Sequence, residues 1–224
     1  MNKQPRLFIT LALGLVLSSQ AMAAFTLDST RFIYPEGRKN ISVEVTNHAN
    51  VTFGGQVWID NTTQPKDEVF FTPAPTFFRV DAKQKQIIRL ININPNLPKD
   101  RESLFWLNVQ EIPPAPKEGE NVLSLAMNTQ VKLFYRPTTL IEGRAGAEQQ
   151  LKANGNILKN PTPYYFAVTE VSVNGKKLKL SEGVDKALSQ FAPFSEVNLQ
   201  QPLNGAVEVE AVDDYGGRRK YNLK

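Results

Sequence analysis

Residues 121–135 read NVLSLAMNTQVKLFY, and this run decides the fold. Its first part alternates apolar with small or polar side chains, and its end is rich in β-branched and aromatic residues, which together are typical of a β-strand. The length predicts one very long strand over Val122–Arg136. Pro137 ends it, because proline lacks a ladder donor and fixes φ.

Similar short runs precede this strand and are separated by turn residues. The candidate strands are Leu27–Tyr34, Ile41–Thr46, Gln56–Asp60, Phe77–Val80, Ile87–Asn92 and Leu104–Glu111. Strands at this spacing predict two packed antiparallel sheets, each burying one face. We therefore expect an immunoglobulin-like sandwich over residues 24–138.

A second β series follows the proline. Its candidate strands are Leu151–Ala153, Tyr164–Val173, Lys176–Leu180, Glu196–Leu199, Val207–Val212 and Lys220–Leu223, and no convincing amphipathic helix interrupts them. Asn174-Gly175 predicts a two-residue hairpin turn, and Tyr215-Gly216-Gly217 another turn. The chain is predicted to be all-β, with a second β-sandwich domain over residues 139–224.

The N-terminus has the features of a cleaved secretory signal. Lys3 and Arg6 precede an apolar run over Leu7–Leu17, and Ala21-Met22-Ala23 is a small-x-small cleavage site. The run is shorter than the roughly 20 residues that span a bilayer, so we expect no membrane insertion. Without this leader, residues 1–23, the formal net charge falls from +4 to +2, which gives no reason to expect a nucleic-acid partner.

Composition removes several enzyme classes. The 224 residues contain no cysteine, which excludes disulfides and thiolate chemistry, and only one histidine, His48, which we expect to be solvated in a turn. A histidine-based triad or zinc site would have to include that residue. We expect no catalytic residues, metal or cofactor.

Leu123, Leu125 and Met127 form an apolar row on one face of the long strand. A buried core strand gives this pattern, and so does an edge strand that offers its apolar side chains to another protein by strand addition. The residues alone leave both interpretations open.

The chain resembles the periplasmic pilus-assembly chaperones of the P-pilus and type 1 pilus family, short-loop branch. The motifs that carry the resemblance are Leu97–Pro114 (LPKDRESLFWLNVQEIPP), Val131–Pro137 (VKLFYRP), Asn160–Tyr165 (NPTPYY) and Asp213–Arg218 (DDYGGR). They are collinear through both domains. The branch assignment rests on the seven-residue loop Ala115–Asn121.

The resemblance implies a boomerang-shaped pair of immunoglobulin-like domains that captures, folds and caps fimbrial subunits and delivers them to an outer-membrane usher. Subunits of that family lack a strand, and the chaperone lends them the apolar row of Leu123, Leu125 and Met127. Self-association that covers the free edge is a further expectation.

The resemblance also implies a cation pair, Arg31 and Lys132, that binds the subunit's C-terminal carboxylate. Taken alone, Lys132 is typical of a snorkelling surface lysine. Ideal alternation points it away from the apolar row, so either a bulge or strong twist near Thr129-Gln130 intervenes or the cleft approaches from the strand's other side.

A third set, Glu102, Arg136 and Asp214, matches an ion network that joins the two domains in this family; the alternative is three unrelated surface charges. Pro73 and Pro75 lie where the family has a proline pair, but Ala74 separates them, which leaves their cis or trans state open.

Two other functions compete with the chaperone interpretation. A secreted pilus subunit would share the β-rich character but should be a single incomplete domain. A carbohydrate hydrolase or binding module would use the carboxylates of Asp213-Asp214 or of Glu208 and Glu210.

Overall fold

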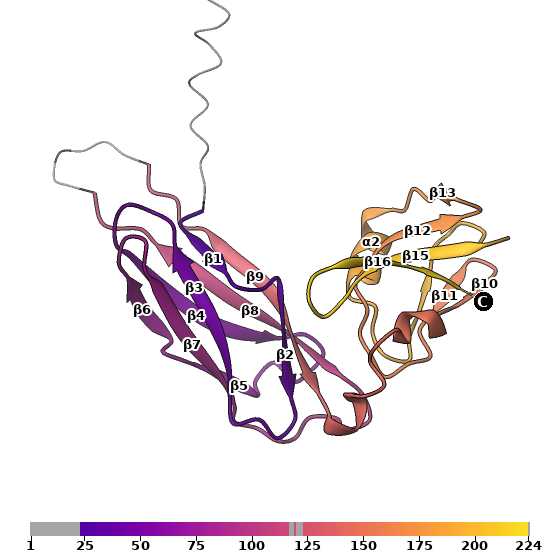
Figure 1. The fold of residues 1–224 in the computed structure, drawn as a ribbon, viewed down its shortest axis with the longest axis horizontal. Coiled ribbons are helices and arrows are strands. Elements are labelled where there is room, and N and C mark those ends of the chain that lie inside the picture. Colours follow the sequence, from indigo (N-terminus) through magenta and orange to yellow (C-terminus); the bar gives the residue numbers. More distant parts are fainter. Residues whose placement is uncertain (1–22, 117–118, 120–122, 224) are drawn as a thin grey trace, which may run out of the picture.

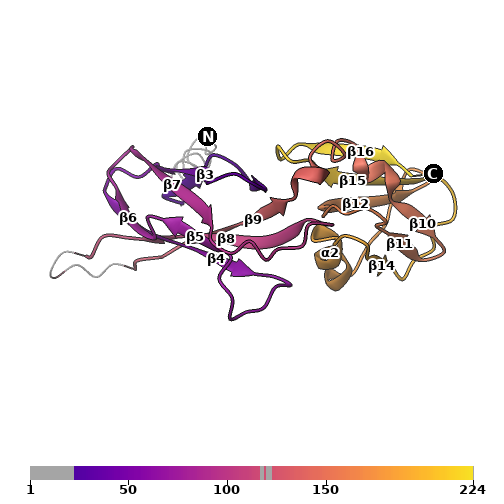
Figure 2. The ribbon, with the colours of Figure 1, turned by 90° about the horizontal axis from the view of Figure 1, so that it is seen from below.

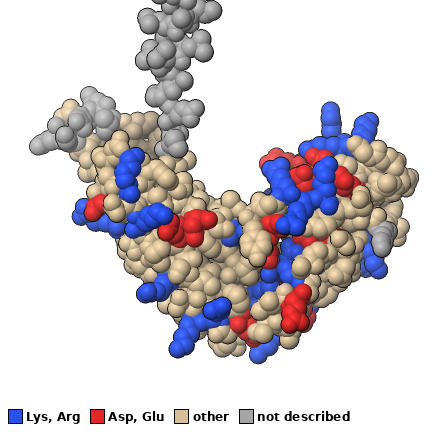
Figure 3. All heavy atoms as spheres, viewed as in Figure 1, with Lys and Arg blue, Asp and Glu red and all other residues tan. Residues whose placement is uncertain are grey.

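The computed structural model describes residues 23–116, 119 and 123–223, and shows two β domains that meet at an angle (Figure 1). The all-β prediction is confirmed apart from one short helix. No helix among the described residues is long and apolar enough to cross a bilayer. The space-filling view is hollowed between the two domains, and charged side chains of both signs gather on the C-terminal side of the hollow (Figure 3).

The N-terminal domain packs a five-stranded sheet, ordered β2-β9-β8-β4-β6, against a four-stranded sheet, ordered β1-β3-β7-β5. The strands are β1 Phe25–Leu27, β2 Arg31–Pro35, β3 Ile41–Asn47, β4 Phe53–Asn61, β5 Phe71–Ala74, β6 Phe77–Val80, β7 Lys85–Asn92, β8 Ser103–Ile112 and β9 Asn128–Arg136. Neighbouring strands pair antiparallel except β2 and β9, which run parallel.

Aromatic side chains fill the space between these sheets. Phe105 on β8 is fully buried and meets Phe71 on β5 edge to face, with ring centroids 4.9 Å apart. Leu133 and Tyr135 of β9 enter the same core. Period-2 alternation therefore places the odd-numbered side chains of β9 inside the sandwich and the even-numbered ones on its outer face.

The strand predictions for this domain differ from the structure at three places. Leu27–Tyr34 divides into β1 and β2, because the chain leaves the four-stranded sheet between them and joins the other sheet. β5 was missed because Pro73 and Pro75 obscure its pattern, and the Ala74–Pro75 bond is cis. The predicted long strand begins at Asn128 rather than Val122, which itself lies outside the described residues.

In the C-terminal domain a four-stranded sheet, ordered β13-β12-β15-β16, faces a three-stranded sheet, ordered β10-β11-β14. The strands are β10 Lys152–Asn154, β11 Ile157–Lys159, β12 Val168–Val173, β13 Lys176–Lys177, β14 Glu196–Asn198, β15 Val207–Val212 and β16 Arg218–Asn222. Leu158, Val171 and Val209 are almost completely buried in the core between them.

The hairpin prediction is confirmed at Asn174-Gly175, where both residues have positive φ, 51° and 77°, and join β12 to β13. The expectation of no helix was wrong. The helix α2, Glu182–Ser189, buries Val184 and Leu188, a pattern too short to stand out by periodicity. β11 was also missed, and β12 begins at Val168 rather than Tyr164.

The two domains are joined directly after β9. This strand runs along its sheet toward the C-terminal domain (Figure 2) and ends at Arg136. Two 3₁₀ turns follow, η1 Thr138–Leu140 and η2 Ala147–Gln150. The outer face of β9 thus leads from the N-terminal sandwich to the junction.

Candidate functional site

The cation pair lies where β2 and β9 run side by side at the junction. Arg31 and Lys132 are register partners in the parallel ladder. Arg31 donates from Nη1 to the carbonyl oxygen of Val212 at 2.9 Å, and Lys132 donates from Nζ to that of Ser189. Both acceptors belong to the C-terminal domain, so each cation reaches across the junction.

The surroundings of this pair disfavour positive charge. Burial and the neighbouring Arg31 guanidinium lower the pKa of Lys132 to about 8. Burial likewise lowers the pKa of Arg31, although Asp214 opposes the shift. Nε of Arg31 is buried and has no hydrogen-bond partner among the described residues. An arriving anion would supply both the missing acceptor and the compensating charge.

Trp106 forms part of the same surface. It is the register partner of Lys132 on β8, and Nζ of Lys132 lies 5.9 Å from a Trp106 ring centroid. An indole face stabilises a nearby cation. The aromatic neighbour therefore helps to keep the Lys132 ammonium in place.

The apolar row lies exposed at the far end of β9. The exposed fractions of Leu123, Leu125 and Met127 are 86%, 64% and 48%. None of the three belongs to a strand, although Met127 accepts a 2.8 Å hydrogen bond from the backbone N of Glu111. The buried-core interpretation thus applies to Leu133 and Tyr135 but not to the row.

The relation of Lys132 to the row follows from the register. β8 and β9 pair without a shift from Gln110–Asn128 to Ser103–Tyr135, so there is no bulge near Thr129-Gln130. Lys132 therefore points to the outer face of the sheet, opposite the core. The register thus excludes the bulge considered from the sequence, and the outward orientation of Lys132 fits a cleft that approaches from the strand's other side.

The hinge network, Glu102, Arg136 and Asp214, connects the domains by charge. Arg136 Nε lies 2.6 Å from Glu102 Oε1, and Arg136 Nη1 lies 2.6 Å from Asp214 Oδ2. The other Glu102 oxygen accepts from the backbone N of Tyr165 at 2.8 Å. Burial alone would raise the pKa of Asp214, but its hydrogen bonds to Arg136 hold it below its usual range.

Sequence reasoning missed two members of this charged cluster. Nη2 of Arg144 lies 2.8 Å from Glu148 Oε1, and its Nε lies 3.5 Å from Asp214 Oδ1. Both side chains are at least nine-tenths buried. Their four-residue spacing is the signal that sequence reasoning could have used.

The carboxylates considered for acid–base chemistry are engaged with cations instead. Asp213 pairs with Arg219 at 2.9 Å, Glu208 with Lys220 at 2.9 Å, and Glu210 with Arg218 at 3.5 Å. Within the described part of the chain, no group of three or more His, Asp or Glu side chains is placed to hold a metal.

Comparison with known proteins covers both domains. Residues 24–141 match the family described as pili and flagellar-assembly chaperone, PapD N-terminal domain, and residues 146–223 match pili assembly chaperone PapD, C-terminal domain. The chain is 48% identical to the chaperone protein FanE of Escherichia coli over 229 residues, which cover 100% of this chain and 99% of FanE. It is 35% identical to FimC of Escherichia coli K12 over 216 residues, 93% of this chain and 87% of FimC.

Solved structures give the same similarity in three dimensions. The periplasmic chaperone SfaE matches with a TM-score of 0.71 at 30% identity, over 89% of this chain and 98% of SfaE. A complex of the Salmonella enterica SafA pilin with the SafB chaperone contains a chain that matches with a TM-score of 0.72 at 26% identity, over 91% of this chain and 97% of that one.

Proposed function

The chain belongs to the family of PapD-like periplasmic pilus-assembly chaperones, which are not enzymes, and on that basis we propose that it captures pilus subunits by donor-strand complementation. The apolar row of Leu123, Leu125 and Met127 fills the place of a strand that the subunit lacks. The cation pair, Arg31 and Lys132, binds the subunit's C-terminal carboxylate. The completed subunit is then passed to an outer-membrane usher.

One observation carries the proposal. A single chain segment presents three exposed apolar side chains at one end and, five residues beyond Met127, a half-buried lysine beside an arginine with an unpaired Nε. An extended client strand alongside β9 would contact both features. Together the two features set the orientation of the client strand, whose C-terminus would lie at the domain junction.

The energies are of the right size for reversible capture. Burying three large apolar side chains contributes roughly 5–9 kcal/mol before ordering costs. Charge-assisted hydrogen bonds to a carboxylate add roughly 1.5–3 kcal/mol each. Client backbone groups that pair with the strand fix the register, and the folding of the client itself supplies the driving force.

The remaining assignments complete this proposal. The leader, residues 1–23, directs secretion to the periplasm and is removed after Ala23. The chain is assigned to the short-loop branch, which serves rod-like adhesive pili, and the support for this is the seven-residue length of the loop Ala115–Asn121, much of which lies outside the described residues. The hinge network holds the angle between the domains, and so the position of the C-terminal domain beside the cation pair.

The test compares subunit capture by periplasmic wild-type protein with capture by Arg31→Ala and Lys132→Ala. The client is first identified by mass spectrometry of what co-purifies with the wild type. Each variant should lose the complex while its circular dichroism stays unchanged. Lys176→Ala, an exposed lysine on the hairpin strand β13, is the matched control and should retain it. Recovery of the subunit at wild-type yield with either variant contradicts the anchor.

The exposed row also supports self-association of the free protein, because an uncovered apolar segment invites pairing with another copy. Sedimentation velocity should show a concentration-dependent dimer that disappears when the client binds. A free protein that remains monomeric at high concentration contradicts this part of the proposal.

A further inference from the structure

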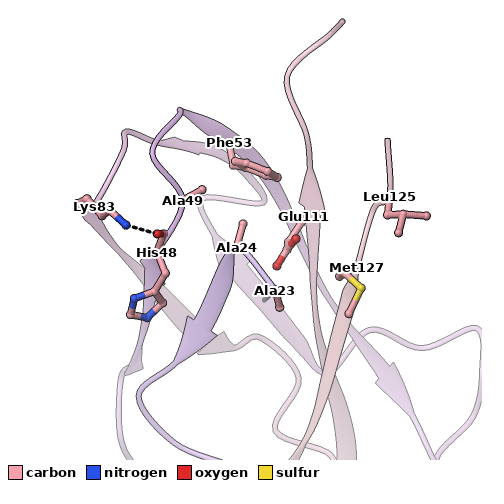
Figure 4. A pocket seen from close by; sticks show the side chains of 9 residues that line it. All are labelled: Ala23, Ala24, His48, Ala49, Phe53, Lys83, Glu111, Leu125 and Met127. Carbon is pink, nitrogen blue, oxygen red and sulfur yellow. Dashed lines mark hydrogen bonds between the residues drawn. The ribbon is translucent and has the colours of Figure 1, made fainter. Parts of the chain in front are cut away.

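Glu111 is a buried carboxylate at the end of β8, beside the start of the secreted chain. Its residue is only 2% exposed. It lines a surface hollow of about 510 Å³ whose other walls include Ala23, Ala24, Phe53, Leu125 and Met127 (Figure 4). These neighbours are apolar, so they offer nothing to balance a carboxylate charge.

The polar contacts of Glu111 link two parts of the domain. Its Oε1 accepts a 2.7 Å hydrogen bond from the backbone N of Phe25, the first residue of β1. Its own backbone N donates a hydrogen bond to the carbonyl oxygen of Met127. In residues 23–116, 119 and 123–223, no cationic side chain forms an ion pair with it. Buried carboxylates ordinarily have a cationic partner, because leaving one unpaired is costly.

Two titratable groups from neighbouring turns face the same hollow, and both are engaged elsewhere. Lys83, from the turn between β6 and β7, donates from Nζ to the backbone oxygen of His48 (Figure 4). The His48 ring bonds through Nε2 to Thr26 Oγ1 at 2.8 Å. Neither is the counter-ion of the carboxylate in this arrangement.

A further cation arises at this place when the leader is removed. Cleavage after Ala23 turns the amide nitrogen of Ala24 into an α-ammonium group. Ala24 is held in position, since its carbonyl oxygen accepts from His48 N at 2.7 Å. Only three covalent bonds separate Ala24 N from Phe25 N, so the new amine lies within roughly 7 Å of the Glu111 carboxylate.

We propose that Glu111 is the binding site for the protein's own processed N-terminus, and that the α-ammonium of Ala24 forms an ion pair with its carboxylate. The inference rests on cleavage after Ala23, as proposed above. The pair fastens β1 to the end of β8, the strand end that also holds Met127 through its backbone. Removal of the leader would thus stabilise the base of the segment that enters the client.

The first experiment titrates the N-terminal amine. The mature protein is purified from periplasm, its first residue is read by intact mass, and its amines are labelled by reductive methylation with ¹³C-formaldehyde for NMR. In the folded wild type, the pKa of the N-terminal amine should lie about one unit or more above its value in the same protein unfolded in urea. In Glu111→Gln this difference should disappear, whereas Lys83→Met should keep it.

The second experiment covers the case in which Glu111→Gln does not fold. A mature chain with one extra glycine ahead of Ala24 displaces the ammonium and leaves Glu111 intact. Its thermal midpoint should fall, and the same glycine added to Glu111→Gln, where that variant folds, should cause no further loss.

The outcomes separate the inference from the proposed processing. A first residue other than Ala24 overturns the cleavage site and this inference with it. A chain that begins at Ala24 but whose amine titrates alike when folded and unfolded overturns the inference alone. So does a thermal midpoint that falls in Lys83→Met and not in the glycine-extended chain, because Lys83 would then be the partner.

Discussion

Arg31 on β2 and Lys132 on β9 are direct register partners in a parallel strand pair, so two cationic side chains lie side by side at the domain junction. Each also donates to a backbone oxygen of the C-terminal domain, at Val212 and Ser189. The arrangement has a cost, since burial lowers the pKa of Lys132 to about 8. A ligand that brings a negative charge would offset the cost of burying these cations, so the site favours such a ligand.

The first prediction is a pH dependence of carboxylate binding. Above pH 8 the Lys132 side chain of the free protein is mostly uncharged, so Lys132 must take up a proton from solvent when the carboxylate binds. The affinity for a peptide that copies the client's C-terminal strand should be constant from pH 6 to about 7.5 and should then fall by up to tenfold per pH unit. Isothermal titration calorimetry measures it.

The matched control is the same peptide with an amidated C-terminus. Without a carboxylate, its affinity should be lower at pH 7 and nearly independent of pH. Equal pH profiles for the two peptides contradict the anchor. The free protein should also gain stability as the pH rises from about 8 toward 10.5, since the folded pKa of Lys132 lies below its unfolded value and the cost of burying the charge is then relieved.

The second prediction concerns the apolar row. Leu125 is 64% exposed, so Leu125→Glu should leave the thermal midpoint of the free protein unchanged. In the proposed complex the client would bury the same side chain, so its loss should weaken client binding by about 10-fold to 100-fold. Val69→Glu, at a position that is 61% exposed and outside β9, is the control and should bind normally. Unfolding of free Leu125→Glu would favour a buried position for the row.

The third prediction tests the packing that supports β4 and β6. A Cβ at Gly55 would lie 2.3 Å from Cζ of Phe78, whose ring stacks on Phe25 at 5.8 Å between centroids. Gly55→Ala should therefore lower the free energy of unfolding by about 1–3 kcal/mol, measured by urea denaturation. Gly183→Ala, in α2 with open space around it, is the matched control and should not destabilise the protein. A neutral Gly55→Ala would show that the Phe78 ring moves aside without cost.

The strands of the N-terminal domain were largely predictable because its sandwich repeats one rule: apolar side chains at every second position. β8 and the second half of β9 follow it, and both were found. β5 and the break between β1 and β2 were not found. Pro73 hides the strand pattern of β5, and at Asp28–Thr30 the chain passes from one sheet to the other. The sequence pattern does not say which sheet a strand joins. That choice is made by contacts distant in sequence.

The candidate functional site was likewise only partly predictable from the sequence. The alternation of Leu123, Leu125 and Met127 is visible in the sequence, but whether such a row is buried or exposed depends on what covers it, and here nothing among the described residues does so completely. Arg144 and Glu148 are buried beside the hinge network by elements distant in sequence: Arg144 lies against the rings of Tyr164 and Phe166, and η2, which carries Glu148, contacts β16. Single-sequence patterns carry no information on such docking.

The last prediction concerns the hinge network at low pH. Although burial opposes it, hydrogen bonding to Arg136 holds the pKa of Asp214 below its usual value, and the unfolded chain restores that value. The carboxylate therefore stabilises the fold above its unfolded pKa, and this contribution is lost as the pH falls through the folded pKa. At pH 7, Asp214→Asn should reduce the free energy of unfolding by about 1–3 kcal/mol, and the difference from wild type should shrink below about pH 4.

Chemical denaturation at a series of pH values measures this difference, with Asp67→Asn, an exposed loop position, as the control that should match wild type throughout. Small-angle X-ray scattering of the same proteins separates stability from geometry. Because Asp214 is the acceptor that the C-terminal domain provides for Arg136, its neutralisation should broaden the distribution of interdomain distances while both domains stay folded. An unchanged scattering profile together with a full loss of stability would assign the network to stability alone and leave the angle to the packing of Phe134 against Tyr165, whose rings lie 6.1 Å apart.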